Sequence, residues 1–154
     1  MNIIKLVLYE FIVIVFIFLF AWAFTFLDAI FLLKSFQAEW SIITGIAILL
    51  LGVTLRFWAA LIFYTGGIEF LALAAQQNIV KKAPFSFSRN PLMISNILIA
   101  LAIVLIVGSI TGFVIPLIVF MVSHLWVVFY EEKNLEKKFG KEYLDYKKEV
   151  RRWL

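Results

Sequence analysis

The sequence contains no cysteine and only one histidine, His124. Disulfide bonds and thiolate metal sites are therefore excluded, and no metal ion is expected, because a structural zinc site needs several Cys or His ligands. Charged residues are also scarce, at 16% of 154 residues, where a soluble domain has about 25%. Hydrophobic residues reach 64%, which is more than a small globule can bury, because small folds leave much of their surface exposed. A soluble domain, a disordered chain and a secreted disulfide scaffold are excluded together, and lipid is the expected solvent.

Long apolar runs divide the chain into membrane spans, each of which needs about 20 mostly apolar residues to cross about 30 Å of hydrocarbon. The region 91–130 is too long for one crossing, and Gly108-Ser109 followed by Thr111-Gly112 supplies a turn in its middle. The sequence therefore predicts an all-α integral membrane protein with four transmembrane helices, a cytoplasmic connector and a C-terminal amphipathic helix. The predicted spans are residues 6–27, 42–64, 91–108 and 111–130, and the cytoplasmic tail is 131–154. Since no linker or internal repeat divides the chain, residues 1–154 are expected to form a single domain.

The basic residues predict the orientation of these spans, because cytoplasmic loops carry an excess of Lys and Arg. If the N-terminus is cytoplasmic, that side receives twelve of the fourteen basic residues, the outside receives only Lys34, and Arg56 lies inside a span. Both termini are therefore expected in the cytoplasm. The tail mixes eight basic with six acidic side chains, so the formal net charge of +4 is mainly a topology signal. A nucleic-acid partner, which needs a basic face with base-reading or stacking groups, is not expected.

The tail carries one apolar stripe on an otherwise charged helix. The stripe residues follow each other at steps of 4, 4, 3 and 4, which is the period of an amphipathic helix. They are Leu135, Phe139, Tyr143, Tyr146 and Val150. Two interpretations remain open: the stripe lies on the membrane surface, or it packs on the protein itself. Gly140 is a candidate break between two helical pieces.

Ionisable residues inside or beside the spans are the first candidate functional groups, because charge in a bilayer is expensive. Arg56 is either a snorkelling or paired arginine, or an arginine that faces a polar cavity between helices. His124 and Glu131 follow helical spacing and are expected on one helix face. Glu131 and Glu132 lie at a helix C-terminal end, where the helix dipole disfavours negative charge. They are either a solvated acidic end paired with nearby lysines or a carboxylate pair that receives a polar or cationic ligand.

A second polar group begins the third predicted span. Arg89-Asn90-Pro91 precedes that helix, and a helix start offers free backbone N–H groups that favour a carboxylate or phosphate. A hairpin of two spans brings its outer ends to the same membrane face, so this segment and Glu131-Glu132 are expected to be neighbours. Together they predict one pocket at the cytoplasmic surface, with an anion-binding wall and a cation-binding wall. Such a pocket suits a zwitterionic ligand.

Three segments resemble the isoprenylcysteine carboxyl methyltransferase and phospholipid methyltransferase superfamily. The run from Glu131 to Val150 is similar to the family's C-terminal signature, and Val80 to Ser95 is similar to its segment of the form G-P-Y-x-x-x-R-H/N-P-x-Y-x-G. Leu55-Arg56-Phe57-Trp58 resembles the second-helix segment, so the resemblance covers about residues 50–154. His124 recurs in a bacterial and archaeal branch of the family, which favours the cytoplasmic membrane of a prokaryote.

The resemblance implies a membrane-embedded methyltransferase that uses S-adenosylmethionine, has no Rossmann domain and acts on a lipid, isoprenoid or other membrane-dissolved acceptor. It also implies that the cofactor lies under the connector and the tail. The residues that it assigns to the cofactor are Gln77, Val80, Phe85, Asn90, Pro91, Glu131 and Glu132. Arg89 and His124 are the candidate catalytic residues. His124 or a glutamate is the candidate base for an amine acceptor, and the alternative for His124 is a plain helix-packing residue.

The chain departs from the family pattern at several positions. Ala83 and Ser95 replace glycines, while Phe85 and Met93 replace tyrosines, which removes two hydroxyl groups that could hold the cofactor. Val127 stands where the eukaryotic prenylcysteine enzymes have a substrate-binding arginine. Two functions therefore remain open: an active methyltransferase, and a non-catalytic family member that serves as a membrane scaffold or lipid-binding module. The acceptor and the oligomeric state are not specified by the residues.

Overall fold

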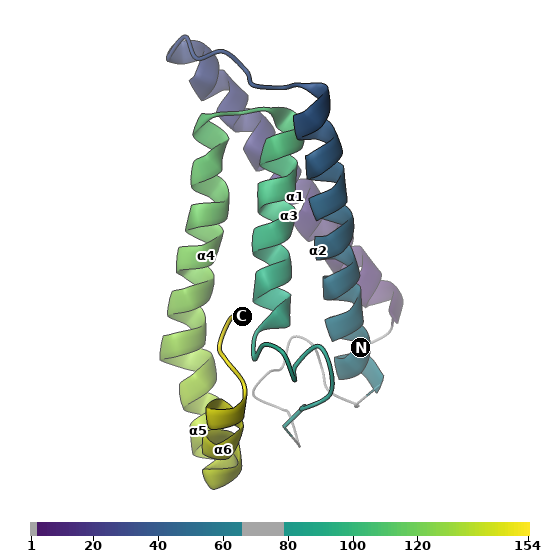
Figure 1. The fold of residues 1–154 in the computed structure, drawn as a ribbon, viewed down its shortest axis with the longest axis vertical. Helices are drawn as coiled ribbons and strands as arrows, with labels where there is room; N and C mark the ends of the chain where they lie inside the picture. The colour runs from purple at the N-terminus through teal and green to yellow at the C-terminus, as the bar shows by residue number, and fades with distance from the viewer. Residues whose placement is uncertain (1–2, 66–78) are drawn as a thin grey trace.

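The computed structural model describes residues 3–65 and 79–154, and these residues form a bundle of helices (Figure 1). In chain order the helical segments are α1 (Ile3–Ile30), α2 (Glu39–Thr65), α3 (Pro91–Val107), the short 3₁₀ turn η2 (Thr111–Phe113), α4 (Val114–Trp126), the π-helical segment η3 (Val127–Glu131), α5 (Glu132–Phe139) and α6 (Lys141–Glu149). Figure 1 shows α3 between α2 and α4, with α1 crossing behind them and with α5 and α6 beyond the lower end of α4.

Three helical stretches are long and apolar enough to cross a membrane by length and composition: Phe11–Ile30, Glu39–Ile62 and Thr111–Phe139. A shorter apolar helix, α3, has 17 residues and matches the third predicted span, 91–108, to within one residue. The chain is thus an all-helical membrane protein in the part that the structure describes. The predicted hairpin turn is confirmed as well, since α3 ends at Val107 and the next helical turn begins at Thr111.

The fourth predicted span ends at residue 130, but the helix continues beyond it to Phe139. The continuation passes through η3, where the backbone accommodates a wider π turn. Such a turn changes the register of everything that follows it along the helix. No apolar or turn pattern marks the insertion, because Val127-Val128-Phe129-Tyr130 also suits an ordinary α-helix.

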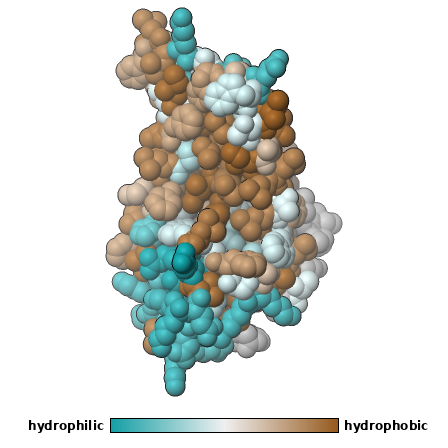
Figure 2. All heavy atoms as spheres, viewed as in Figure 1, coloured by the Kyte–Doolittle hydropathy of each residue, from teal (hydrophilic) through white to brown (hydrophobic). Residues whose placement is uncertain are grey.

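The buried core of the bundle centres on α3. Its cluster consists of Ala21, Ile99, Ala100, Ile103, Val104 and Ile115, drawn from α1, α3 and α4. The other faces of α1, α2 and α4 carry exposed aromatic and aliphatic side chains, among them Phe16, Trp22 and Leu117. Figure 2 shows these hydrophobic side chains over the middle of the bundle and hydrophilic side chains at its lower end. An apolar surface of this extent is expected to face lipid.

Two glycines bring α2 unusually close to α3. A Cβ atom at Gly45 would lie 2.7 Å from Cγ1 of Ile106 and 2.9 Å from the carbonyl oxygen of Ala102, and Gly52 is similarly tight against Ile99. Small residues allow membrane helices to pack at short separation, where dispersion contacts replace the hydrophobic effect that lipid does not provide. On the same helix pair, the buried Arg56 donates a hydrogen bond to Asn96 of α3, which favours the paired-arginine interpretation over a cavity-facing one.

Asp28 ties the upper end of α1 to the turn between α3 and α4. Its carboxylate is buried and accepts the backbone N–H groups of Ile110, at 3.1 Å, and Thr111, at 2.9 Å. The hydroxyl of Thr111 in turn donates to the carbonyl of Phe24. Asp28 therefore caps the start of the next helical segment from outside it, a role that is invisible in the sequence because 82 residues separate Asp28 from Ile110.

Replacing Asp28 by alanine is expected to lower the free energy of unfolding by about 1–2 kcal/mol, the range for loss of a helix cap, because two partly buried backbone N–H groups lose their acceptor. Denaturant unfolding in detergent micelles measures the change. The matched control is Glu39→Ala, an exposed acid at the start of α2, which is expected to stay within about 0.5 kcal/mol of the wild type. Equal stability of the two variants would contradict the capping role.

The tail folds back on the lower end of the bundle as two short helices. Gly140, with φ of +50°, separates α5 from α6, as expected of the candidate break. Tyr143, Tyr146 and Val150 are buried together, with Leu135, Phe139 and Ile79 packed against them. The apolar stripe therefore packs on the protein itself.

Candidate functional site

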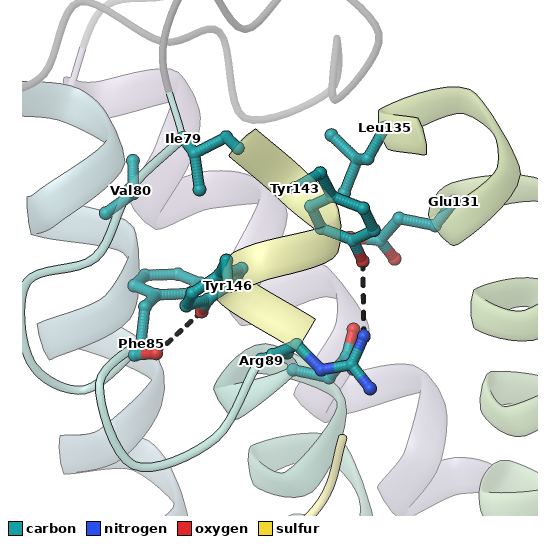
Figure 3. A pocket seen from close by; sticks show the side chains of 9 residues that line it. Ile79, Val80, Phe85, Arg89, Glu131, Leu135, Tyr143 and Tyr146 are labelled. Atoms are coloured by element: carbon teal, nitrogen blue, oxygen red, sulfur yellow. Dashed lines mark hydrogen bonds between the residues drawn. The ribbon is translucent and has the colours of Figure 1, made fainter. Parts of the chain in front are cut away.

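A pocket lies at the lower end of the bundle, between the end of the connector, the start of α3 and the tail helices (Figure 3). Its empty space is about 400 Å³ when the open mouth is counted with it. The lining residues are Ile79, Val80, Phe85, Arg89, Asn90, Glu131, Leu135, Tyr143 and Tyr146. Apolar and aromatic side chains form this lining together with the polar or charged side chains of Arg89, Asn90 and Glu131.

Five residues singled out from the sequence meet in this pocket. They are Val80, Phe85, Arg89, Asn90 and Glu131. Pro91 is buried in the first turn of α3, next to Asn90, and does not line the cavity. Glu132 and His124 also lie outside the lining, and Gln77 lies outside the described residues. The predicted meeting of the α3 start with the end of the fourth span is thus present in the structure.

Two buried polar atoms of the pocket residues have no hydrogen-bond partner in the described structure. They are Oε2 of Glu131 and Nε of Arg89. Buried polar atoms are nearly always paired with protein or water, so an acceptor and a donor left open in one cavity indicate a place for a polar ligand. The pair offers one atom that accepts a hydrogen bond and one N–H that donates, which agrees in kind with the anion-binding and cation-binding walls expected from the sequence.

Glu132 points into a cluster of cations behind the pocket. Its carboxylate, with a side chain only 6% exposed, lies 2.8 Å from Nη1 of Arg89, 2.8 Å from Nε of Arg152 and 3.3 Å from Nζ of Lys147. Successive residues on a helix point about 100° apart, since a turn takes 3.6 residues, so Glu131 and Glu132 face different surroundings. Glu132 therefore holds Arg89 from behind, and its direct contact with a ligand stays a prediction.

Tyr143 and Tyr146 supply phenol groups to the same pocket. Burial raises the pKa of Tyr143 to about 12 and also raises the pKa of Tyr146, so both phenols stay protonated at physiological pH. The hydroxyl of Tyr146 donates to the carbonyl of Phe85 at 2.6 Å, and Nη1 of Arg89 lies 3.5 Å from the Tyr143 oxygen (Figure 3). Sequence reasoning placed both tyrosines in the apolar stripe and missed this role, although their place in the stripe beside Glu131 was a usable signal.

The chain after α6 lies across the start of α3. We call residues Val150–Leu154 the C-terminal strap. The backbone N–H of Arg89 donates to the carbonyl of Arg151 at 3.0 Å. The carbonyl of Arg152 accepts the Asn90 side-chain amide at 3.0 Å and the Ser88 hydroxyl at 3.2 Å. The sequence predicts an anion at the start of α3. In the structure, carbonyl groups of the strap accept some of the hydrogen bonds that this helix start can donate.

His124 sits on α4 against the strap rather than in the pocket. Its ring stacks on Trp153, with centroids 6.0 Å apart and planes at 26°, and lies 5.9 Å from the ring of Phe120. Nδ1 of His124 is buried and has no hydrogen-bond partner in the described part of the chain. His124 and Glu131 thus occupy separate surroundings, although their spacing in the sequence places them on one face of an ordinary α-helix.

These features define a helical membrane protein with a partly polar pocket at one end of its bundle, closed by its own tail. A model of the phospholipid methyltransferase family matches residues 40–142, and the chain belongs to that family. The matched region contains α2, α3, α4 and α5 with the pocket residues Arg89 and Glu131, whereas the C-terminal strap lies beyond it. Methyltransferases of this family use S-adenosylmethionine. The comparisons with curated proteins and with solved structures gave no match.

Proposed function

We propose that the protein is an integral membrane methyltransferase that transfers a methyl group from S-adenosylmethionine to a lipid, isoprenoid or other membrane-dissolved acceptor. The observation that carries the proposal is the pair of open polar atoms, Oε2 of Glu131 and Nε of Arg89, in a pocket within the family-matched region. An acceptor and a donor without partners in the described structure, on residues that line a pocket of mixed polarity, suit an amphiphilic zwitterion.

The residues present fit the cofactor. S-adenosylmethionine carries a carboxylate, which suits the N–H groups of Arg89, and an amino group and ribose hydroxyls, which suit the open oxygen of Glu131. Val80, Phe85 and Leu135 offer apolar walls for its purine. The remaining assigned residues are proposed to contribute around this core. They are Gln77, Asn90, Pro91 and Glu132.

The protein's part in the reaction is to bind, orient and exclude water. When bound, S-adenosylmethionine would supply a methyl group on a positively charged sulfur: the acceptor's nucleophile would bond to the methyl carbon as the carbon–sulfur bond breaks and the neutral thioether leaves. Arg89 and Glu131 hold the polar groups of the cofactor, so that its reactive end has one orientation. The buried rings of Tyr143 and Tyr146 keep water from that side of the pocket. An anionic acceptor needs no base. For an amine acceptor, the proposed base is Nδ1 of His124, which lies outside the pocket lining and has no partner in the described structure.

We further propose four membrane crossings in one domain, residues 1–154, with both termini in the cytoplasm of a prokaryote. Two observations support this topology. Figure 1 shows that α1 begins near the end of the bundle where α2 ends and the tail helices lie, as an even number of crossings requires. The basic residues gather at that same end, while Lys34 lies at the other.

Isothermal titration of S-adenosylmethionine into detergent-purified protein tests the function, followed by mass spectrometry of membrane lipids from cells with and without the protein. We expect binding, and a lipid species heavier by one methylene group that appears only with the protein. No binding at millimolar cofactor would overturn the enzymatic proposal.

The absence of motif hydroxyls at Phe85 and Met93 favours the second candidate, a non-catalytic scaffold or lipid-binding module. Cofactor binding without a methylated product would support that candidate, and turnover with any acceptor would exclude it.

A further inference from the structure

The C-terminal strap is the least regular part of the site, yet polar contacts hold it firmly. Val150 is extended, with φ of −122° and ψ of 131°, and no helix follows it. From there the chain runs back from α6 to a position between α3 and α4 (Figure 1). Its contacts agree with this path, since the strap's carbonyls meet Ser88, Arg89 and Asn90 at the α3 start while its Trp153 meets α4.

Arg152 fastens the strap by a two-point ion pair. Its Nε and Nη2 donate to the two carboxylate oxygens of Glu132, at 2.8 and 3.0 Å. A forked arginine–carboxylate pair fixes both distance and direction, which a lysine cannot do. The strap is thereby tied to the same carboxylate that holds Arg89 in the pocket.

The ion pair of Arg152 with Glu132 is more accessible to water than that of Arg89. The Arg152 side chain is 32% exposed, whereas that of Arg89 is 8% exposed. If Arg152 leaves, Glu132 keeps Arg89 and Lys147 as partners, so no buried charge is stranded. Leu154, beyond the ion pair, is 79% exposed. Opening of the strap therefore requires the loss of the Arg152–Glu132 ion pair, of the hydrogen bonds from Ser88, Arg89 and Asn90 to the strap's carbonyls, and of the Trp153 ring contacts with α4.

The strap places the ring of Trp153 against α4. This ring covers His124 and lies 5.5 Å from the ring of Phe120, both on α4. Since Nδ1 of His124 is buried behind this aromatic layer, a reactant that comes along α4 from the hydrocarbon meets Trp153 before it meets the imidazole.

We propose that the C-terminal strap is a gate that controls access of the membrane-dissolved acceptor to His124. Arg152 holds the strap on Glu132, and Trp153 covers the imidazole. This inference rests on the proposed methyl transfer, because the acceptor is part of that reaction. The labelling experiment that tests it does not require the reaction to take place. Arg152 and Trp153 are positioning residues, since they act on access to the site.

Cysteine accessibility tests the gate directly, because the chain contains no cysteine of its own. His124→Cys gives a single thiol beneath Trp153, and its rate of reaction with N-ethylmaleimide is measured in full-length protein in nanodiscs. Adding Trp153→Ala or Arg152→Gln is expected to raise the rate about tenfold or more, because labelling follows the population of the open state. Arg152→Lys, which keeps one ion pair, is expected to give an intermediate rate.

Leu125→Cys is the matched control, since Leu125 is the next residue on α4 and is exposed toward lipid. Its labelling rate is expected to be the same with and without Trp153→Ala. Equal rates at His124→Cys in all strap backgrounds would overturn the gate. If Trp153→Ala fails to fold, Arg152→Gln, which keeps the tryptophan, decides the question alone.

Cofactor titration separates failure of the gate from failure of the proposed function. The gate predicts that Trp153→Ala leaves the dissociation constant of S-adenosylmethionine within about twofold of the wild type, because Trp153 does not line the pocket. Binding with unchanged labelling rates would refute the gate and leave the methyltransferase standing. Faster labelling without any cofactor binding would keep the gate as a property of the fold and refute the methyltransferase.

Discussion

Replacing Glu131 by glutamine is expected to weaken S-adenosylmethionine binding by about tenfold to a hundredfold, as for loss of a charge-assisted hydrogen bond worth roughly 1.5–3 kcal/mol. The substitution keeps the shape of the side chain but removes its charge and turns one acceptor oxygen into a donor. The open Oε2 of Glu131 is the acceptor that the pocket offers to an amino group or a ribose hydroxyl. Isothermal titration of wild type and variant in the same detergent measures the change.

Glu142→Gln is the control for this experiment. Glu142 is an exposed acid on the neighbouring α6 whose salt bridge to Lys81 is a loose 3.8 Å, so its loss is expected to change neither affinity nor stability measurably. An unchanged dissociation constant for Glu131→Gln, in a variant that unfolds at the wild-type temperature, would remove Glu131 from the cofactor site.

Replacing Glu132 by glutamine is expected to destabilise the fold by about 3–5 kcal/mol, the cost of removing one partner from a buried ion pair. The change leaves Arg89, Arg152 and Lys147 gathered without their shared carboxylate, and Arg89 is nearly as buried as Glu132. The start of α3, α6 and the C-terminal strap all lose their common anchor. Denaturant unfolding in detergent micelles, followed by circular dichroism, measures the loss.

Glu136 offers a matched comparison, since it pairs with the same Lys147 but its side chain is 38% exposed. Glu136→Gln is expected to change stability by no more than about 1 kcal/mol, as for other exposed pairs. The double variant Arg89→Gln/Glu132→Gln is expected to lose less stability than the sum of the losses in the two single variants. Each single change leaves the other side chain with an unpaired buried charge, and the second change removes that charge. A Glu132→Gln variant as stable as Glu136→Gln would show that the cluster is not an anchor.

Local patterns in the sequence were sufficient for most of the fold. Hydrophobic runs predict helices near 6–27, 42–64 and 91–108, and the structure has helices there because twenty apolar residues in lipid have no other way to satisfy their backbone. The glycines at 108 and 112 locate the hairpin turn, since Gly108 takes a positive φ of 73° that other residues avoid. The position of the pocket could be predicted from the apolar runs and the hairpin turn, because a hairpin of two spans brings its outer ends to the same face of the membrane.

What the sequence left hidden depends on pairs of residues far apart in the chain. Asp28 caps a helix 82 residues later, and Arg152 meets Glu132 and Asn90 across 20 and 62 residues. Period and spacing describe only neighbours along a helix, so neither contact has a signature. The π turn at Val127–Glu131 is hidden for a different reason, because it depends on how the helix end meets the tail. The turn leaves Glu131 facing the pocket and Glu132 facing the cations.

The short α3 has a consequence for how the protein fits its bilayer. Its 17 residues span about 26 Å, whereas the helical stretch Thr111–Phe139 spans about 43 Å at 1.5 Å per residue. The two helices are joined by the turn at one end of the bundle. At the opposite end α3 is therefore shorter than the stretch Thr111–Phe139, and the chain that leads into α3 lies in the space that this difference leaves. Hydrophobic mismatch of this size is costly for a helix that faces lipid, but α3 packs against α1, α2 and α4 instead. We therefore expect the pocket at its start to sit at the depth of the lipid headgroups, where a water-soluble and a lipid-soluble molecule can meet without either crossing the bilayer.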